Sequence, residues 1–279
     1  MNVEQKRKAE SILALALSTL AAFSGLFWLV FILGDVLVHG IGALTPALFL
    51  NDPTPPGVVG GGLRNAFVGQ LMITAFATLI GVPIGILGGT FLAEYARGTR
   101  TARAISVLSD IMVSVPSIVV GTFIYAIMVK TVGHFNGWAG AVALAVIMIP
   151  VVLRTTEDML SLVPWTLREA AFALGAPYYR VIIEVVYRGA ATGIFTGVLL
   201  SIARVAGETA PLLFTSFNNS FFSTDMRGPV ASLTATIFQY AMGPYEEWHM
   251  QAWGAAFIIT VFILLITIAG RLIIKWRYK

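Results

Sequence analysis

Six apolar runs, each long enough to cross a lipid bilayer, constrain the fold of this 279-residue chain more than any other feature. About 20 consecutive apolar residues span the hydrocarbon core as a helix. Because lipid offers the backbone no hydrogen-bond partner, each run has to satisfy its own polar groups, and a helix does so within one segment. We therefore predict an all-α integral membrane protein with six transmembrane helices. Their expected positions are approximately residues 12–34, 64–95, 104–130, 138–158, 189–216 and 250–275.

Composition agrees with a membrane protein and argues against several kinds of site. Only 11% of the residues are charged, whereas a soluble domain has about 25%. The chain has no cysteine, so it can form neither a disulfide nor a thiolate site. Its three histidines, His39, His134 and His249, lie too far apart in the sequence for a metal-ligand motif. No paired acids or Ser-His-Asp set suggests catalysis, so we expect no metal site, no catalytic residue and no enzyme activity.

The distribution of lysine and arginine predicts that both termini are cytoplasmic, because cytoplasmic loops carry the excess of basic residues. Of the 18 basic residues, three (Arg64, Lys130 and Arg227) fall in outer loops and one (Arg204) within a helix, which leaves 14 on the inner side. The predicted organisation is a single transmembrane domain over residues 12–275 with cytoplasmic tails at 1–11 and 276–279. Its outer loops cover about residues 35–63 and 217–249, and the main inner loop covers about 159–188.

The segment of residues 154–188 is the only long polar interruption in this apolar chain. It contains Glu169-Ala170-Ala171 and, after three more residues, Gly175. The alanines favour a helix, Gly175 permits a left-handed turn, and Pro177 suits the start of a second helix. The pattern predicts a short helix, a sharp turn and another short helix, with small side chains that let a partner approach closely.

This segment resembles the EAA loop of ABC-importer permeases, a cytoplasmic loop that docks into a groove on an ATPase subunit. The family pattern is E-A-A, three residues, G, nine residues, I, one residue and L-P. Glu169, Ala170, Ala171 and Gly175 match it, Val185 takes the isoleucine position, and Tyr187-Arg188 replaces L-P. The resemblance implies that the four matching residues dock on the ATPase. The alternative is an alanine-rich loop that contains the pattern by chance.

The fifth apolar run carries the deepest charge of the chain. Arg204 lies about 15 residues into it, or roughly 22 Å along a helix. An arginine at such a depth costs at least about 2.5–3.5 kcal/mol, so it needs a partner or water. Glu208 follows one turn later and is expected on the same helical face. Either the two form an ion pair that locks helices together, or Arg204 binds a transported anion and Glu208 balances its charge while the path is empty.

Four further acidic or basic residues lie near helix ends. Arg154 and Glu157 stand three apart and share a face, either as an interfacial ion pair of little energetic value or as part of a substrate path. Asp110 is either a hydrogen-bonded carboxylate near a helix end or, if Pro116 kinks that helix, a group facing an internal cavity. Glu94, at the end of the second helix, is expected to be solvated.

Four stretches together resemble the PstA family of phosphate permeases from ABC importers. They are ATLIGVPIGILGGTFLAEY in the second helix, VPSIVVG from Val115, the EAA loop, and ARVAGETAPLLF from Ala203. The resemblance covers about residues 57–275. It implies the type I importer permease fold, with a coupling helix between transmembrane helices 4 and 5, and a role in phosphate import. The substrate pathway that it implies contains Arg154, Glu157, Arg204, Glu208 and Thr209.

The same resemblance implies a set of partners in a bacterial or archaeal inner membrane. They are a sister permease (PstC), two copies of an ATPase (PstB) and a phosphate-binding protein (PstS), besides the lipid bilayer; no nucleic acid is expected. The chain has no G-x-x-x-x-G-K-[ST] motif, so ATP and Mg²⁺ are expected on the ATPase and no cofactor on this chain. The Pro- and Gly-rich stretch 51–62 and the loop 217–249 are either connectors or contacts for the external binding protein.

Two other functions stay open at this point. The first is a permease of the same architecture for another anion, such as sulfate or molybdate. The second is an ion-driven secondary carrier or channel that needs no ATPase, which the EAA loop argues against. A structural scaffold without transport gives Arg204 no reason to lie so deep.

Overall fold

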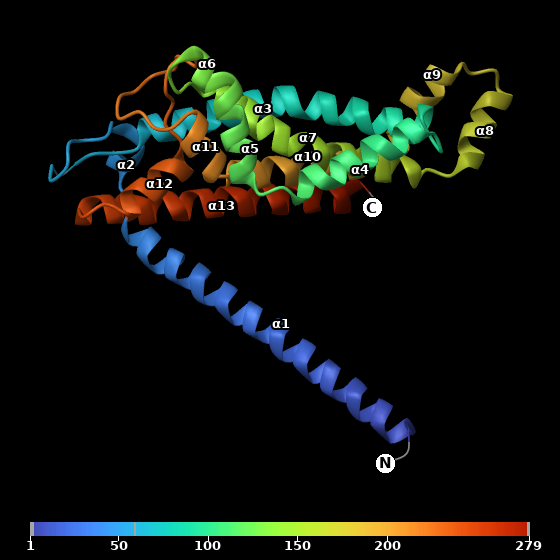
Figure 1. The fold of residues 1–279 in the computed structure, drawn as a ribbon, viewed down its shortest axis with the longest axis horizontal. Helices are drawn as coiled ribbons and strands as arrows, with labels where there is room; N and C mark the ends of the chain where they lie inside the picture. The colour runs from blue at the N-terminus through green and yellow to red at the C-terminus, as the bar shows by residue number, and fades with distance from the viewer. Residues whose placement is uncertain (1–2, 59, 278–279) are drawn as a thin grey trace.

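The computed structural model describes residues 3–58 and 60–277, and every regular element in them is a helix. Figure 1 shows a bundle of long helices from which the first helix projects. In chain order the elements are α1 (Val3–Gly42), α2 (Pro46–Leu50), α3 (Arg64–Thr90), η1 (Phe91–Tyr95), α4 (Arg100–Ser114), α5 (Ser117–Ile124), η2 (Tyr125–Val129), α6 (Lys130–Val132), α7 (Gly137–Ser161), α8 (Trp165–Ala173), α9 (Tyr178–Arg180), η3 (Val181–Val186), α10 (Tyr187–Ala206), α11 (Ala210–Thr215), α12 (Leu233–Ala241) and α13 (Glu246–Arg277). The three η elements are short π-helical segments within longer helical runs.

Within the described residues, five helical segments are long and apolar enough to cross a membrane. They are Glu10–Gly42, Arg64–Tyr95, Gly137–Ser161, Tyr178–Ala206 and Glu246–Leu272. A sixth crossing requires Arg100–Ser114 and Ser117–Val132 to act as one broken span, because they meet at an angle of 101°. The prediction of six membrane helices agrees with this count, but the prediction of one continuous helix over residues 104–130 is wrong.

Pro116 explains the break in the third span. Its ring removes a backbone N–H donor and disfavours the helical conformation of the residue before it. Val115 accordingly has φ −68° and ψ 130°, an extended conformation, and α5 begins at Ser117. The expected kink at Pro116 is therefore present, in the stronger form of two separate helices, while Asp110 is a hydrogen-bonded, exposed carboxylate.

The first helix is longer than predicted. It continues to Gly42, so residues 35–42 of the predicted outer loop are helical, and only α2 forms a separate short helix before the Pro- and Gly-rich stretch. Residues 1, 2, 278 and 279 of the two predicted tails lie outside the described residues.

The fifth span also has different bounds from the predicted 189–216. Its helical run begins at Tyr178 and ends at Ala206, and a new helix, α11, starts at Ala210 with Pro211 in its first turn. Proline is well tolerated there because the first helical N–H groups have no intrahelical partner. Glu208 consequently lies in the break between two helices, so the prediction that it shares a helical face with Arg204 was wrong.

Glycines on α3 allow it to pack closely on α7, which forms the centre of the bundle. A Cβ atom at Gly85 would lie 2.7 Å from Cβ of Val152, and one at Gly89 would lie 2.5 Å from the carbonyl oxygen of Leu153. Small residues permit such approach in lipid, where helices associate by close packing. The buried core beside this contact includes Ile73 of α3, with Leu144 and Met148 of α7.

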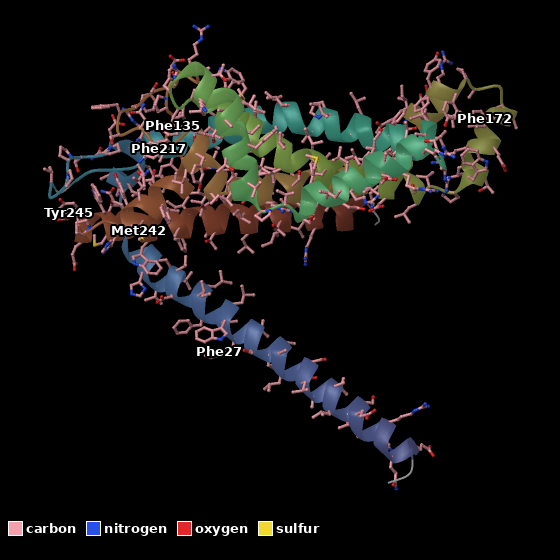
Figure 2. All side chains as sticks on the ribbon, in the orientation of Figure 1. Phe27, Phe135, Phe172, Phe217, Met242 and Tyr245 are labelled. Atoms are coloured by element: carbon pink, nitrogen blue, oxygen red, sulfur yellow. The ribbon has the colours of Figure 1, made fainter. Side chains whose placement is uncertain are left out.

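The long helices run between two ends of the molecule (Figure 1). We call them the α8 end, which carries α8 and α9, and the α12 end, which carries α2, α11 and α12. Helix α1 meets the bundle near the α12 end, where His39 stacks on Trp253 at 4.9 Å. The rest of α1 stands away from the bundle with side chains such as Phe27 exposed, and its N-terminal end points towards the side of the α8 end (Figure 2).

Candidate functional site

A tight turn joins α8 and α9 in the segment that contains the Glu-Ala-Ala motif. Gly175 has φ +78°, a left-handed conformation that an L-residue rarely adopts. The N–H of Gly175 donates to the carbonyl of Phe172 at 2.8 Å, and the N–H of Ala176 donates to that of Ala171 at 3.2 Å. This pair of bonds is the Schellman pattern, which satisfies the last carbonyl groups of a helix. The predicted order of helix, turn and helix is therefore confirmed.

Arg168 anchors α8 to the body of the molecule through a buried ion pair. Its side chain is 3% exposed, and its Nη2 atom donates to Oε1 of Glu94 at 2.5 Å, while the Glu94 side chain is 1% exposed. The same guanidinium donates from Nη2 to the carbonyl of Leu160 at 3.0 Å and from Nη1 to that of Val163 at 2.6 Å. One side chain thus connects α8, the end of α7 and η1.

Tyr178 reinforces this anchor from the other side of the turn. Its hydroxyl donates to the backbone carbonyl of Glu94 at 2.7 Å. Its ring stacks on Phe172 of α8 at 5.8 Å between centroids and meets Tyr95 edge-on at 5.4 Å. Both sides of the turn at Gly175 are consequently attached to the same short segment, η1.

The prediction that Glu94 is a solvated helix end was wrong. Its carboxylate pairs with an arginine 74 positions away in the sequence, and local composition contains no sign of that contact. A usable signal was the arginine that stands directly before the Glu-Ala-Ala motif. On α8 its neighbour Glu169 is exposed, whereas Arg168 is buried. Arg168 was predicted only as one of several basic residues in the inner loop.

The outer surface of α8 is exposed and rich in apolar side chains. Glu169 and Ala170 are exposed, and Ala171 is partly buried beneath them. Trp165 is 48% exposed and Leu174 is 90% exposed, and Figure 2 shows Phe172 at the same extremity. An exposed apolar patch of this kind, bordered by a charged residue, is typical of a protein–protein contact.

A second charged cluster lies between α4 and α7. The Nη2 atom of Arg154 donates to both carboxylate oxygens of Asp110, at 2.9 Å and 3.0 Å, and Nη1 donates to Oε2 of Glu157 at 3.0 Å. The three side chains are 39%, 59% and 21% exposed, in that order. The expected contact of Arg154 with Glu157 is therefore present, and Asp110 is the partner that the sequence did not place there.

Arg204 differs from the two arginines above because no carboxylate in the described part of the chain lies within ion-pair distance of it. Arg204 is exposed on α10, whereas Glu208 and Thr209 are half-buried in the break before α11. The backbone of Glu208 is held by Thr234, whose hydroxyl donates to the Glu208 carbonyl at 2.9 Å. The ion pair of Arg204 with Glu208, one of the two predicted arrangements, does not form in this structure.

Arg154 and Arg204 lie at different depths. Thr155 of α7 packs directly against Gly197 of α10, which puts Arg154 near the level of Gly197. Arg204 follows Gly197 by seven residues, or about 10 Å along the helix. It therefore lies nearer to the α12 end than the Asp110–Arg154–Glu157 cluster does.

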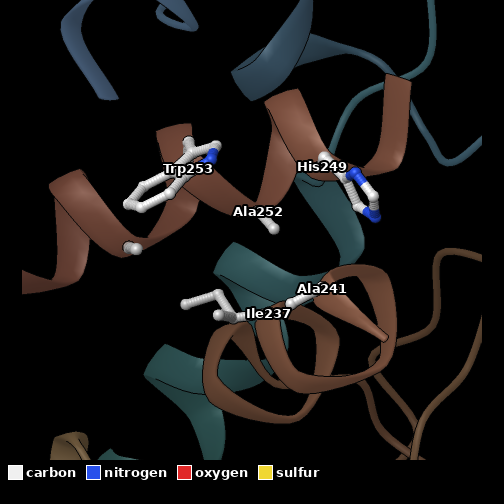
Figure 3. Close-up of a pocket in the computed structure, with 6 residues that line it drawn as sticks. Ile237, Ala241, His249, Ala252 and Trp253 are labelled. Atoms are coloured by element: carbon white, nitrogen blue, oxygen red, sulfur yellow. The ribbon is translucent and has the colours of Figure 1, made fainter. Parts of the chain in front are cut away.

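Two cavities of the described structure are mainly apolar and do not suit an anion. One, of about 700 Å³, has Ile202 and Ala206 in its wall. These residues stand two positions from Arg204, and two positions on a helix are about 200° apart, so Arg204 projects from the opposite face of α10. Another, of about 390 Å³, lies between α12 and α13 and is lined by Ile237, His249 and Trp253 among others (Figure 3).

Comparison with known proteins agrees with these features. Residues 81–277 match the family described as "Binding-protein-dependent transport system inner membrane component". The chain is 52% identical to the "Phosphate transport system permease protein PstA" of Pasteurella multocida, over 98% of this chain and 97% of that protein. A protein of the same name from Haemophilus influenzae is 49% identical, over 97% of this chain and 96% of that protein.

The fold is also found among solved structures. A chain of the MetNI methionine ABC transporter, described as inward facing, superposes with a TM-score of 0.62. The match has 21% sequence identity and covers 76% of this chain and 94% of that chain. This likeness establishes the shared helical architecture of an ABC importer permease.

Proposed function

The chain belongs to the family of binding-protein-dependent transport system inner membrane components, and we propose that it is the permease subunit of an ATP-driven importer of inorganic phosphate. It is a multi-pass protein of the inner membrane and is not itself an enzyme. The observation that carries the choice of substrate is the 52% identity, over nearly the whole chain, to a named phosphate permease.

Arg204 is the proposed binding residue for the anion. It is exposed near the C-terminal end of the membrane-spanning segment Tyr178–Ala206, and in the described structure no carboxylate lies within ion-pair distance of it. A guanidinium matches a tetrahedral oxyanion well, because its planar fork can donate two parallel hydrogen bonds. Glu208 and Thr209, in the helix break just beyond, are the proposed groups that border the bound anion on the side of the α12 end.

The exposed face of α8 is the proposed contact for an ATPase subunit. Glu169, Ala170, Ala171 and Gly175 lie on or beside that face, and the patch is apolar enough to form the centre of an interface. ATP and Mg²⁺ would be bound by that partner. If α8 faces the cytoplasm, the N-terminal end of α1 lies on the same side of the membrane, in agreement with cytoplasmic termini.

Reversing the charge at Glu169 tests this contact. In Glu169→Lys we expect at least tenfold less ATPase subunit to co-purify with the permease. The new positive charge would be buried in the interface, either unpaired or next to a positive charge of the ATPase. Glu10→Lys, the same change on α1, is the control and should co-purify normally. Normal co-purification and uptake with Glu169→Lys would contradict docking at this face.

The α12 end is the proposed contact for an extracytoplasmic phosphate-binding protein. Arg64 joins two loops there, since it donates to Asp52 at 3.0 Å and 2.7 Å and lies over the ring of Phe222 at 4.5 Å. These loops and the start of α13 enclose a pocket of about 470 Å³ whose wall includes Phe221 and Trp248. Phe221 is 81% exposed, which leaves it free to contact a docked protein. The second permease of the pathway is proposed to be a sister chain of the same fold.

Transport in vesicles tests the proposed substrate. The chain would be reconstituted with the sister permease, the ATPase and the binding protein encoded beside it, and radiolabelled phosphate uptake would be followed with and without ATP. We expect ATP-dependent uptake that unlabelled phosphate suppresses and that sulfate and molybdate do not. Suppression by sulfate or molybdate would favour another anion, and full uptake by this chain alone under an ion gradient would favour a secondary carrier.

A further inference from the structure

We infer that Asp110 is an exchangeable counter-ion of Arg154, which the transported anion has to replace, and that the coupling helix α8 controls this exchange. The replacement of Asp110 by the anion rests on the proposed transport function. The control of this exchange by α8 rests on geometry alone. Asp110 belongs to none of the pathway residues expected from family resemblance. Its role follows from the bidentate contact with Arg154 across two helices.

The cluster repels anions as long as Asp110 stays in place. Two carboxylates and one guanidinium sum to one negative charge, and both oxygens of Asp110 occupy Nη2 of Arg154. If Asp110 withdraws, Arg154 and Glu157 together are neutral, and Nη2 regains two N–H donors. Those donors can then bind two oxygens of a tetrahedral anion, as they now bind the two oxygens of Asp110.

Breaking the ion pair of Asp110 with Arg154 costs little free energy, as an exchangeable contact requires. The side chains of Asp110 and Arg154 are 59% and 39% exposed, so water or an anion can reach both. Ion pairs with this degree of exposure contribute little net stability, because solvent replaces the lost partner. An anion that arrives at Arg154 therefore competes with Asp110 on similar terms.

Helix α4 is free to carry Asp110 away from α7. The break at Val115 and Pro116 begins five residues after Asp110 and separates α4 from α5, with the two axes at 101°. Helix α5 packs on α11 and on α7, whereas the main packing partner of α4 in the described structure is α7. A change of angle at Pro116 can thus move Asp110 without disturbing α5.

The other end of α4 is connected to α8. Thr99 caps α4, since its Oγ1 accepts from the N–H of Ala102 at 3.1 Å and donates to the carbonyl of Ala96 at 2.6 Å. Two residues before Ala96 is Glu94, which is held by Arg168 of α8. A displacement of α8 is consequently transmitted through the Glu94–Arg168 ion pair and the short turn at residues 96–99 to α4 and to Asp110.

A distance measurement tests the movement without reference to any substrate. The chain has no cysteine, so spin labels at Val107→Cys and Leu162→Cys would be the only ones on this subunit in the assembled complex. Both positions are exposed, one on α4 and one at the end of α7. We expect their separation to differ by at least about 1 Å between the nucleotide-free and ATP-bound complexes, since the N–O distance of 2.9 Å has to exceed about 4 Å before the ion pair is lost. Equal separations in the two states would overturn the proposal.

Direct binding of radiolabelled phosphate to the complex without the binding protein tests the competition. Asp110→Asn should bind phosphate about 1.4-fold to fivefold more tightly, the range that an exposed ion pair allows. Asp110→Glu should restore normal binding, and Asp158→Asn, which removes a nearby carboxylate that acts on Arg154 only at longer range, should have a smaller effect than Asp110→Asn. Unchanged or weaker binding by Asp110→Asn would also overturn the proposal. If uptake shows that phosphate is not the substrate while the label separation still changes, the proposed function fails and the movement of α4 stands.

Discussion

Two arginine–carboxylate pairs in this molecule have the same chemistry and opposite surroundings. Arg168 and Glu94, at the α8 end, are 3% and 1% exposed, and backbone carbonyls take up further donors of the guanidinium. Arg154 and Asp110, between α4 and α7, are 39% and 59% exposed. Burial therefore divides the two pairs into a permanent attachment and a contact that solvent or an anion can replace.

The reason is the asymmetry between keeping and breaking a buried pair. Removing one partner leaves an uncompensated charge in a medium that cannot solvate it, whereas an exposed partner is simply rehydrated. A coupling segment needs the first kind, because movement is transmitted only through contacts that survive it. A transport path needs the second kind, because its charges have to exchange partners.

The largest expected effect is on the buried pair. Arg168→Leu leaves Glu94 buried and unpaired and should lower stability by about 3–5 kcal/mol, seen as early thermal aggregation of the solubilised complex. Arg180→Leu, a change of the same kind at an exposed position of α9, should alter stability by less than about 0.5 kcal/mol. Equal stability of Arg168→Leu and the wild type would remove the distinction between the two pairs.

A smaller effect is expected at Arg204, which has neither a buried nor an exposed carboxylate partner in the described structure. Arg204→Gln removes charge-assisted hydrogen bonds to the anion, worth about 1.5–3 kcal/mol, so ATP-driven uptake should fall roughly 10- to 150-fold while assembly is unchanged. Arg227→Gln, in an outer loop, should transport normally. Normal uptake by Arg204→Gln would exclude this residue from the anion path.

The turn after α8 should respond more weakly. Gly175→Ala puts a Cβ atom on a residue with φ +78°, which should cost about 1–2 kcal/mol and reduce ATPase co-purification moderately. Gly25→Ala in α1 lies in ordinary helix with open space around it and should leave co-purification unchanged. If both variants behave alike, the conformation of the turn does not matter for docking.

The smallest effect is the coupling free energy of the exposed pair. A double-mutant cycle with Asp110→Asn and Arg154→Gln should give about 0.2–1 kcal/mol for stability. The same cycle with Glu94→Gln and Arg168→Gln should give several times more. Similar coupling energies in the two cycles would show that burial does not separate these pairs.

Local sequence determined the parts of this protein that depend on neighbouring residues. The spans follow from apolar length, and the turn at Gly175 follows from small residues, a glycine and a proline within one short stretch. The depth of Arg204 is a matter of counting along one helical run. Even there, the predicted helix over residues 189–216 is too long at its C-terminal end, because α10 ends at Ala206 with Gly207 as its cap.

Tertiary structure decided which charges meet. Glu94 and Arg168 are 74 positions apart and Asp110 and Arg154 are 44 apart, so no periodicity or spacing pairs them. Their contacts arise from how α4, α7 and α8 pack, and burial then sets what each contact costs to break. The same packing leaves Arg204 unpaired, since ending α10 at Ala206 moves Glu208 away from the face on which a continuous helix would have placed it.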